Sequence, residues 1–356
     1  MSFKIINTLK IKILALVCVC CFMGMPTSLN AQDIHFSQVF ETPLLLSPAN
    51  AGFFNGYVRS NINYRNQWPA MNNTFKTMAL SVDGGLFKTR TRPAFMGLGL
   101  QITNDKAGAA NLSTTNILLH LNGLLKINRH SVASVGIAGG TWAMNGDYNN
   151  LLYASQFNGN YLDPNLISGE IPYRQFTTVD LSVGAAYEYS FLSTDQDHDD
   201  EISIRLAYGG FHLNRPVQDF GVGSSYEMPV KHVMSLTSVL DIIDTRFTAM
   251  PAIIFQKQNN FQSLYFGSIL KYRLRTGTKF TGGRTQNAFG LGLFYRNRDA
   301  FVAKATFDFG NYSCGLSYDL NVSSYRVASN GLGGMEFSLR YNMLANSLFA
   351  ARKEYK

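Results

Sequence analysis

The chain has 356 residues and a formal net charge of +8, with 46% hydrophobic but only 15% charged residues. Its basic residues are spread along the sequence and form no basic run or helix, so nothing in the charge pattern indicates nucleic-acid binding. Beyond residue 31 there is no run of 18 apolar residues, so no transmembrane helix is expected.

Residues 1–31 have the pattern of a cleaved secretory signal peptide. Three lysines form a positive n-region, an apolar h-region covers Ile13–Met25, and the tripeptide LNA precedes Gln32. A lipoprotein signal with Cys20 or Cys21 lipidated is the alternative, which is disfavoured because no small residue precedes either cysteine. Beyond the signal only Cys314 remains, so neither an internal disulfide nor a thiolate metal site is expected.

The stretch Thr177–Phe191 shows the repeating unit of the remaining chain. Its odd positions are mostly apolar and its even positions polar or small, which is the period-two pattern of a strand with two different faces. It is 15 residues long, whereas strands of soluble proteins usually have about 5–6 residues. A tilted strand of about 9–11 residues crosses a bilayer, so the length favours a membrane-spanning strand.

About fourteen such segments follow one another, beginning near residues 57, 74, 95, 113, 130, 177, 201, 231, 245, 261, 286, 300, 311 and 334. Long connections alternate with short ones, as in outer-membrane barrels. A sheet in a membrane has to close, because an open edge leaves backbone groups unpaired in hydrocarbon. We therefore expect an all-β fold, an up-and-down transmembrane β-barrel of about 14 antiparallel strands at 57–343. Residues 32–56 then form a periplasmic segment or a partial plug, and 344–356 a tail.

The alternation also predicts which way each side chain points. The outward, lipid-facing set includes Leu98, Leu100, Leu181 and Val183, and the inward set includes Gln101, Asp180 and Lys304. Small residues such as those of Gly97-x-Gly99 are expected on the inward rows. An even strand number puts both termini in the periplasm. The connections Asn145–Phe176, Phe211–Val230 and Asn321–Gly333 are then expected at the cell surface.

Motifs that would indicate catalysis or metal binding are incomplete. The acidic stretch 195–201 begins like a calcium loop, but Asp200 and Leu206 stand where that loop needs Gly and Glu. The six histidines show no HExxH spacing, and no GxSxG elbow occurs. We expect no enzymatic activity, no cofactor and no metal site. A membrane lipase with a Ser–His pair from distant strands is the enzymatic alternative.

A family resemblance begins at the first residues after the signal. The segment QDIHFSQ (32–38) is followed by PLLLSPANAG (43–52) and YRNQW (64–68). Further short motifs follow in order: Ser81-Val82-Asp83, His212-Leu213-Asn214-x-Pro216, Tyr295-Arg296, Ser317-Tyr318-Asp319 and Gly333-Gly334-x-Glu336. In this order the motifs resemble the PorP/SprF family of type IX secretion system membrane proteins. Ser47 stands where that family usually has Asn.

The resemblance implies an outer-membrane barrel of the type IX secretion and gliding motility machinery. Members of that family assist export or surface anchoring of a cargo protein. The implied partners are outer-membrane lipid, a secreted cargo or adhesin and other type IX secretion components. The alternative is an outer-membrane transport channel, either a porin or a channel for hydrophobic substrates.

The long connections supply candidate partner-contact residues. Loop 145–176 is rich in aromatic and amide side chains, which suit protein contact. The candidates are Tyr148, Tyr153, Phe157, Tyr161, His212 and Pro216. The family-motif residues singled out are Phe36, Ser37, Gln38, Pro48, Gly52, Tyr64, Arg65, Gln67, Trp68, Tyr318 and Asp319. These motif residues also have a structural interpretation, in which Trp68 is part of an interfacial aromatic girdle and Pro48 and Gly52 shape the approach to the barrel.

Overall fold

The computed structural model describes residues 33–68, 75–88, 93–108, 110–147, 151–169, 175–192, 201–219, 225–242, 245–274, 287–323 and 331–343. The predicted signal peptide, most of the acidic stretch 195–201 and the predicted tail 344–356 lie outside these residues. Among the described residues, no helix is long and apolar enough to span a membrane.

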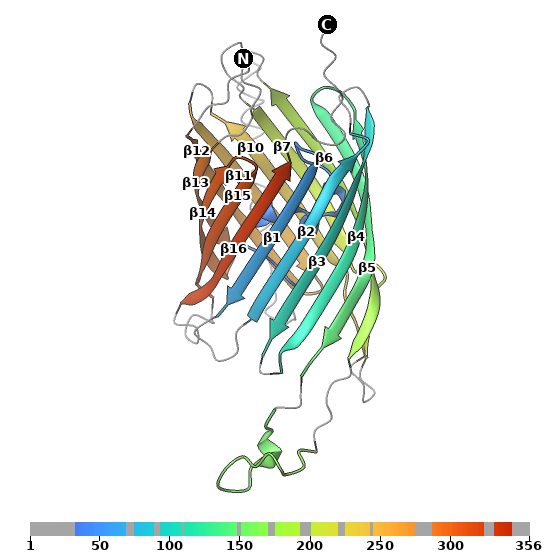
Figure 1. Cartoon of the computed structure of the whole chain (residues 1–356), viewed down its shortest axis with the longest axis vertical. Helices are drawn as coiled ribbons and strands as arrows, with labels where there is room; N and C mark the ends of the chain where they lie inside the picture. Colours follow the sequence, from blue (N-terminus) through green and yellow to red (C-terminus); the bar gives the residue numbers. More distant parts are fainter. Residues whose placement is uncertain are drawn as a thin grey trace, which may run out of the picture.

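Fourteen antiparallel strands form a closed barrel (Figure 1). The first wall strand closes the barrel against the last, from Val58 opposite Met343 to Gln67 opposite Gly334. Every wall strand begins within two residues of the position expected from the alternation. In chain order the wall strands are β1 (Val58–Gln67), β2 (Phe75–Leu86), β3 (Ala94–Ala107), β4 (Leu112–Lys126), β5 (Ser131–Asn145), β6 (Phe176–Leu192), β7 (Glu201–Phe211), β10 (Lys231–Asp241), β11 (Phe247–Gln258), β12 (Phe261–Arg273), β13 (Ala288–Arg296), β14 (Ala300–Phe309), β15 (Tyr312–Asn321) and β16 (Leu332–Met343).

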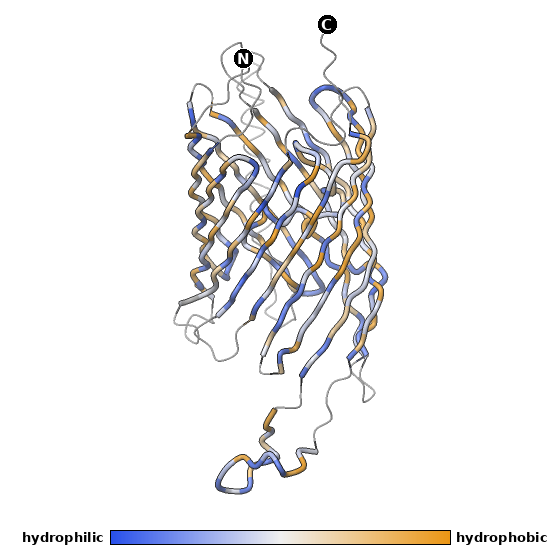
Figure 2. Tube along the Cα trace, in the orientation of Figure 1, coloured by the Kyte–Doolittle hydropathy of each residue, from blue (hydrophilic) through white to orange (hydrophobic). Residues whose placement is uncertain are grey.

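The burial pattern alternates along the wall strands, as expected for strands with an inner and an outer face. Leu181 is 47% exposed on the outside, whereas its neighbour Asp180 is fully buried inside. Gln101 and Lys304 also point inward, and Leu98, Leu100 and Val183 point outward. The predicted register is therefore confirmed, and the hydropathy along each strand alternates accordingly in Figure 2.

The connection between β5 and β6 extends well beyond the wall, and we call this end of the barrel the long-loop end (Figure 1). It includes the short helix η3 (Ala154–Gln156). The connection between β7 and β10 at the same end carries a two-stranded hairpin of β8 (Val217–Asp219) and β9 (Ser225–Glu227). The first residue of β1 and the last of β16 pair at the opposite end.

Residues 33–56, which we call the inner segment, lie inside the barrel. They contain three short helices, η1 (Val39–Glu41), α2 (Pro43–Leu46) and η2 (Pro48–Asn50). The helix η2 contacts β4, β5, β6 and β7. Nearly every residue from Phe36 to Phe53 is buried, so the middle of the lumen is occupied by the chain's own N-terminal part.

Inward-facing glycines leave the space that the inner segment occupies. A Cβ on Gly97 of β3 would collide with the carbonyl group of Ala51, and one on Gly136 of β5 would lie 2.7 Å from the carbonyl of Pro48. Backbone can approach backbone this closely only where no side chain intervenes. The small inward rows expected from the sequence therefore have a specific purpose, which is to hold the inner segment.

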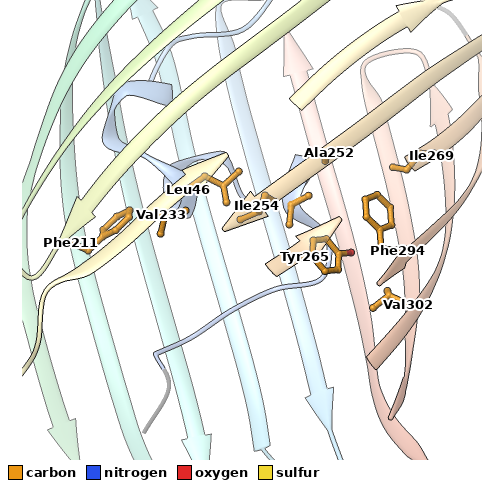
Figure 3. Packing of buried hydrophobic residues seen from close by; sticks show 10 residues of the cluster. Leu46, Phe211, Val233, Ala252, Ile254, Tyr265, Ile269, Phe294 and Val302 are labelled. Carbon is orange, nitrogen blue, oxygen red and sulfur yellow. The ribbon is translucent and has the colours of Figure 1, made fainter. Parts of the chain in front are cut away.

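A hydrophobic cluster joins the inner segment to the opposite wall. Val39 and Leu46 pack with buried apolar side chains from β7 and from β10 to β14. Figure 3 shows Leu46 beside Ile254, with Tyr265 and Phe294 further along the wall. The Tyr265 and Phe294 rings stack with centroids 5.0 Å apart. An inward-facing apolar patch would be out of place in a water-filled pore, and here it is the surface on which the inner segment packs.

Candidate functional site

The first part of the inner segment is held by one carboxylate of the closing strand. The backbone amides of Ser37 and Gln38 donate to the two carboxylate oxygens of Glu336 on β16, at 2.8 and 2.9 Å. The Gln38 side chain also bonds the carbonyl of Glu336 and accepts from the Ser338 hydroxyl. Two successive amides on one carboxylate give a charge-assisted anchor for the backbone.

Two arginines and a second carboxylate surround the side chain of Ser37. Arg65 of β1 and Arg296 of β13 donate to the Ser37 hydroxyl oxygen at 2.9 and 2.7 Å, and the hydroxyl donates to Asp319 of β15. Arg65 also pairs directly with Asp319 at 2.8 Å. All four residues are at least 94% buried. Removing one of the charged members would leave the remaining buried charges with fewer partners, which is destabilising.

Two further ion pairs follow the inner segment along the lumen. Glu41 of η1 accepts from the ammonium group of Lys304 on β14 at 2.6 Å. Further on, the Gly52 amide donates to Asp83 of β2, which is also paired with Arg59 of β1. Gly52 has a φ of +68°, in the left-handed region that favours glycine.

The first residue of the inner segment, Asp33, is held by a group around His212, directly after β7. Its Nδ1 lies 3.0 Å from Asp180 Oδ2 on β6, and its Nε2 lies 3.4 Å from Asp33 Oδ2. Asp33 also pairs with Lys231 of β10 at 2.9 Å. Burial by itself would lower the pKa of His212, but its contacts with Asp180 and Asp33 outweigh burial and raise the pKa to about 9. His212 is therefore protonated at neutral pH and bridges two carboxylates.

Beside this group, the side chain of Asn214 takes the place of a neighbouring strand and bonds the backbone of β6. The pairing of β6 with β7 stops at Val183 opposite Gly210. The first residues of β6, before Val183, therefore have no partner on β7. There the side-chain oxygen of Asn214 accepts a hydrogen bond from the backbone amide of Leu181 at 3.0 Å, and its side-chain nitrogen donates to the Val179 carbonyl at 2.7 Å. The motif His212-Leu213-Asn214 thus pairs the exposed edge of β6 and anchors the inner segment.

A cavity of about 550 Å³ lies between the inner segment and the long-loop end, and we call it the vestibule. Asp33, Ile34 and His35 of the inner segment line it together with the ends of the neighbouring strands and the β8–β9 hairpin. Trp68, Phe75, Trp142 and Tyr226 contribute aromatic surface. This volume falls in the range of cavities that bind small ligands or the side chains of a partner.

Residues 151–169 form a small ordered unit beyond the barrel, which we call the β5–β6 lobe (Figure 1). The Gln156 side chain, only 6% exposed, organises it. Its amide donates to the Leu166 carbonyl and its carbonyl oxygen accepts from the Tyr153 amide, while its backbone carbonyl accepts from the Asp163 amide. A buried residue whose side chain and backbone together bond three other positions of a loop gives the lobe a defined shape.

The lobe exposes apolar side chains on its outside. Phe157 is 55% exposed, Tyr161 61% and Ile167 93%. Leu152 and Leu162 are also exposed. Several exposed apolar side chains on one ordered loop, away from the barrel wall, are a feature of protein interaction sites.

The predicted partner-contact residues have different positions in the structure. Phe157 and Tyr161 are on the exposed surface of the lobe, and Tyr153 is half-buried in it. Tyr148 lies outside the described residues. His212 and Pro216 are buried. Their motif holds the inner segment and the base of the β8–β9 hairpin, and a contact of these two residues with a partner stays a prediction.

The family-motif residues largely converge on the inner segment. Ser37, Gln38, Arg65 and Asp319 meet in the buried group of charges around Glu336. Phe36, Pro48 and Gly52 are also buried, with Pro48 against Gly136 of β5 and Gly52 against Asp83 of β2. Tyr64 points outward and is 42% exposed, and Tyr318 is half-buried. Gln67 and Trp68 line the vestibule, so Trp68 does not belong to an outer girdle.

The partners that complete these clusters were not predicted from the sequence. Glu336 and Arg296 stood in quoted motifs without a role, and Glu41 was not singled out. The sequence signal that could have identified them is a charged residue at an inward-facing strand position whose neighbours on the same face are apolar or small, as at Lys304. Among the described residues, no three His, Cys, Asp or Glu side chains are placed to hold a metal ion.

Comparison with protein families found one match. The family model described as "Type IX secretion system membrane protein PorP/SprF" covers residues 28–341. A comparison with curated proteins found no match.

Several solved structures are similar in fold at low sequence identity. The CymD monoaromatic hydrocarbon channel has 10% identity and a TM-score of 0.46, with 90% of this chain and 96% of that chain covered. A Pseudomonas aeruginosa FadL homologue has 12% identity and a TM-score of 0.44, with 84% and 93% covered. The translocator domain of the autotransporter NalP from Neisseria meningitidis has 8% identity and a TM-score of 0.41, with 86% and 95% covered. With TM-scores below 0.5, these similarities carry no argument about function.

Proposed function

Because this chain belongs to the PorP/SprF family of type IX secretion system membrane proteins, we propose that it is a closed outer-membrane anchor for a secreted protein. In this proposal the cargo binds at the long-loop end, on the cell surface, and does not pass through the lumen. Other components of the secretion machinery bring the cargo to the surface. The outward faces of the strands contact outer-membrane lipid.

The observation that carries the proposal is the exposed apolar surface of the β5–β6 lobe. Phe157, Tyr161 and Ile167 stand on a unit with its own buried Gln156. An ordered loop pays less conformational entropy on binding than a flexible one, so such a surface is suited to hold a partner. The lobe lies at the barrel end opposite to the closing pair Val58 and Met343, which is the end expected outside the cell.

The inner segment supports anchoring over transport. A channel needs a continuous path, whereas residues 36–53 fill the middle of this lumen. They are held by the Glu41–Lys304 ion pair and by hydrogen bonds of their backbone amides to the buried carboxylates of Glu336 and Asp83. Displacing the segment would leave Lys304 without Glu41, and Glu336 without the backbone amides of Ser37 and Gln38, which opposes its movement. The channel alternative predicts steady conductance of the purified protein in planar bilayers, and the anchor proposal predicts none.

Point variants of the lobe test the proposal. Phe157→Ser combined with Ile167→Ser removes apolar contact area and leaves the Gln156 hydrogen bonds in place. Cells with this variant should release to the medium a secreted protein that wild-type cells retain on their surface, with barrel amount and heat-modifiable migration unchanged. Val322→Ser is the matched control, because Val322 is an exposed apolar residue of the β15–β16 connection. Normal retention in the lobe variant would reject the lobe as the docking surface.

A further inference from the structure

The vestibule has a lining that none of the anchoring contacts explains. The chain contains two tryptophans, and both Trp68 and Trp142 line this cavity. Trp68 packs edge-on against Phe75 at a centroid distance of 5.2 Å, and Trp142 packs against Phe176 at 5.6 Å. The indole positions are thus supported by neighbouring rings, so the cavity has walls of defined shape.

Asp105 lies in the wall between these two aromatic groups. In the sheet register it is opposite Thr77 of β2 and Thr114 of β4. Phe75 lies on the first of these neighbouring strands, two residues before Thr77, and Trp142 of β5 is opposite Asn116, two residues after Thr114. An inward-facing carboxylate is therefore flanked by a ring on each side along the cavity wall.

The vestibule is lined by three carboxylates, and Asp105 differs from the other two because it has no ion pair with a basic side chain of the described residues. Asp33 is paired with Lys231 at 2.9 Å and Asp299 with Arg296 at 2.8 Å. Asp105 accepts a hydrogen bond from the Thr77 hydroxyl, and no ion pair of the described residues includes it. Of the described residues that line the vestibule, none is Lys or Arg.

We propose that the vestibule binds a basic side chain, Lys or Arg, from the polypeptide docked at the long-loop end. The faces of indole, phenyl and phenol rings attract a cation, and the Asp105 carboxylate supplies the opposite charge. The methylene stem of Lys or Arg packs on the aromatic and methionine side chains of the same cavity. The inference rests on the proposed function for the identity of the partner, but the cavity's preference for a cation can be measured without any cargo.

Intrinsic fluorescence gives a direct readout, because both tryptophans of the chain report on this one cavity. The purified full-length barrel in detergent is titrated with N-acetyl-lysine N-methylamide. The matched probes are the norleucine amide, which keeps the stem without the charge, and the glutamate amide, which reverses the charge. Glucose tests a neutral saccharide as the ligand. We expect a saturable fluorescence change with the lysine probe and at least a tenfold weaker response to each of the others.

Variants locate the binding to Asp105. Asp105→Asn should weaken the binding of the lysine probe about tenfold or more, and a tenfold change in Kd corresponds to about 1.4 kcal/mol. Asp163→Asn in the lobe is the matched control, since it removes a carboxylate outside the vestibule, and it should bind as wild type does. In the wild-type protein the affinity should also fall as salt is raised from low to physiological concentration, a measurement that does not depend on the folding of any variant.

The outcomes separate this inference from the anchoring proposal. Equal responses to the lysine and norleucine probes, a stronger response to glucose, no response to any probe, or unchanged affinity in Asp105→Asn would each overturn the cation site. None of these results concerns the lobe. Conversely, normal cargo retention in the lobe variant would reject the anchoring proposal and leave the probe titration as it stands.

Discussion

Arg65 and Asp319 are 254 positions apart in the chain, and their side chains meet inside the barrel with Nη2 2.8 Å from Oδ2. They come from β1 and β15, the two neighbours of the last strand β16. The pair therefore crosses the strand on which the barrel closes, and the Ser37 hydroxyl lies between its partners. Barrel closure and the position of the inner segment depend on the same buried charges.

The first prediction concerns this cluster. Arg65→Ala should destabilise the folded barrel by about 3–5 kcal/mol, because Asp319 and Glu336 would then share one fewer buried cation. The measurement is the urea midpoint of unfolding in detergent or lipid. Arg298→Ala, at an exposed turn position, is the matched control and should change stability by less than about 0.5 kcal/mol. Equal midpoints for the two variants would contradict the structural role of the cluster.

A second prediction tests the outward face. Ile137 lies near the middle of β5 and is 56% exposed on the outside of the barrel. Ile137→Arg should reduce folding stability in a bilayer by about 2–4 kcal/mol, the cost of arginine near the membrane midplane. Leu152→Arg, at a similarly exposed position of the lobe, should have little effect. If both variants fold into vesicles like wild type, the exposed face of β5 does not contact hydrocarbon.

The contacts of His212 predict that the stability of the folded barrel decreases at alkaline pH. The pKa of His212 is raised from its ordinary value of 6.5 to about 9. Its contribution to stability is then fully present below pH 6.5 and is lost as the pH rises through about 9. The groups that face it are Asp33, Asp180 and, through Asp33, Lys231. The melting temperature, read from heat-modifiable migration, should fall between pH 7 and 9.5 in wild type. His212→Gln should show a flatter profile, and identical profiles would refute the assignment.

Deleting the inner segment should open the lumen. A chain that lacks residues 33–53 loses the backbone that fills the groove beside Gly97 and Gly136. If it still assembles, it should conduct ions in planar bilayers where the full chain does not. The double variant Gln38→Ala with Ser37→Ala keeps the segment and should conduct less than the deletion. Steady conductance of the full chain would favour the channel alternative.

Surface labelling tests the orientation. With Cys314 replaced by Ser, a cysteine at the exposed position Asn158 of the lobe should react with a membrane-impermeant maleimide on intact cells. A cysteine at Tyr57, at the opposite end of the barrel just before β1, should react only after the outer membrane is opened. The reverse pattern would invert the topology. Ser224, another position in a long connection, lies outside the described residues.

Much of the fold was predictable because period-two alternation is a local signal. Each wall strand shows it within its own residues, so strand number, register and closure followed without knowledge of any long-range contact. The inner segment had no such signal. Its helices are three or four residues long, and its position depends on partners such as Glu336 and Lys304 that are far away in sequence.

The candidate site was predictable only in part for the same reason. The aromatic loop composition singled out Phe157 and Tyr161, which are exposed in the lobe, but it could not reveal that Gln156 organises the loop. His212 and Pro216 were grouped with them because they follow a strand in a long connection. Their burial depends on contacts with Asp33 and with Met228, which no local pattern encodes.

The most direct test of the anchoring claim is site-specific photo-crosslinking in living cells. A benzophenone amino acid at Phe157 on the lobe is compared with one at Phe301, an outward-facing aromatic residue of β14 that is 54% exposed. The account predicts a crosslinked adduct between the barrel and a secreted protein from position 157 and none from position 301. No adduct from position 157 in cells that display the cargo normally, or equal adducts from both positions, would contradict it.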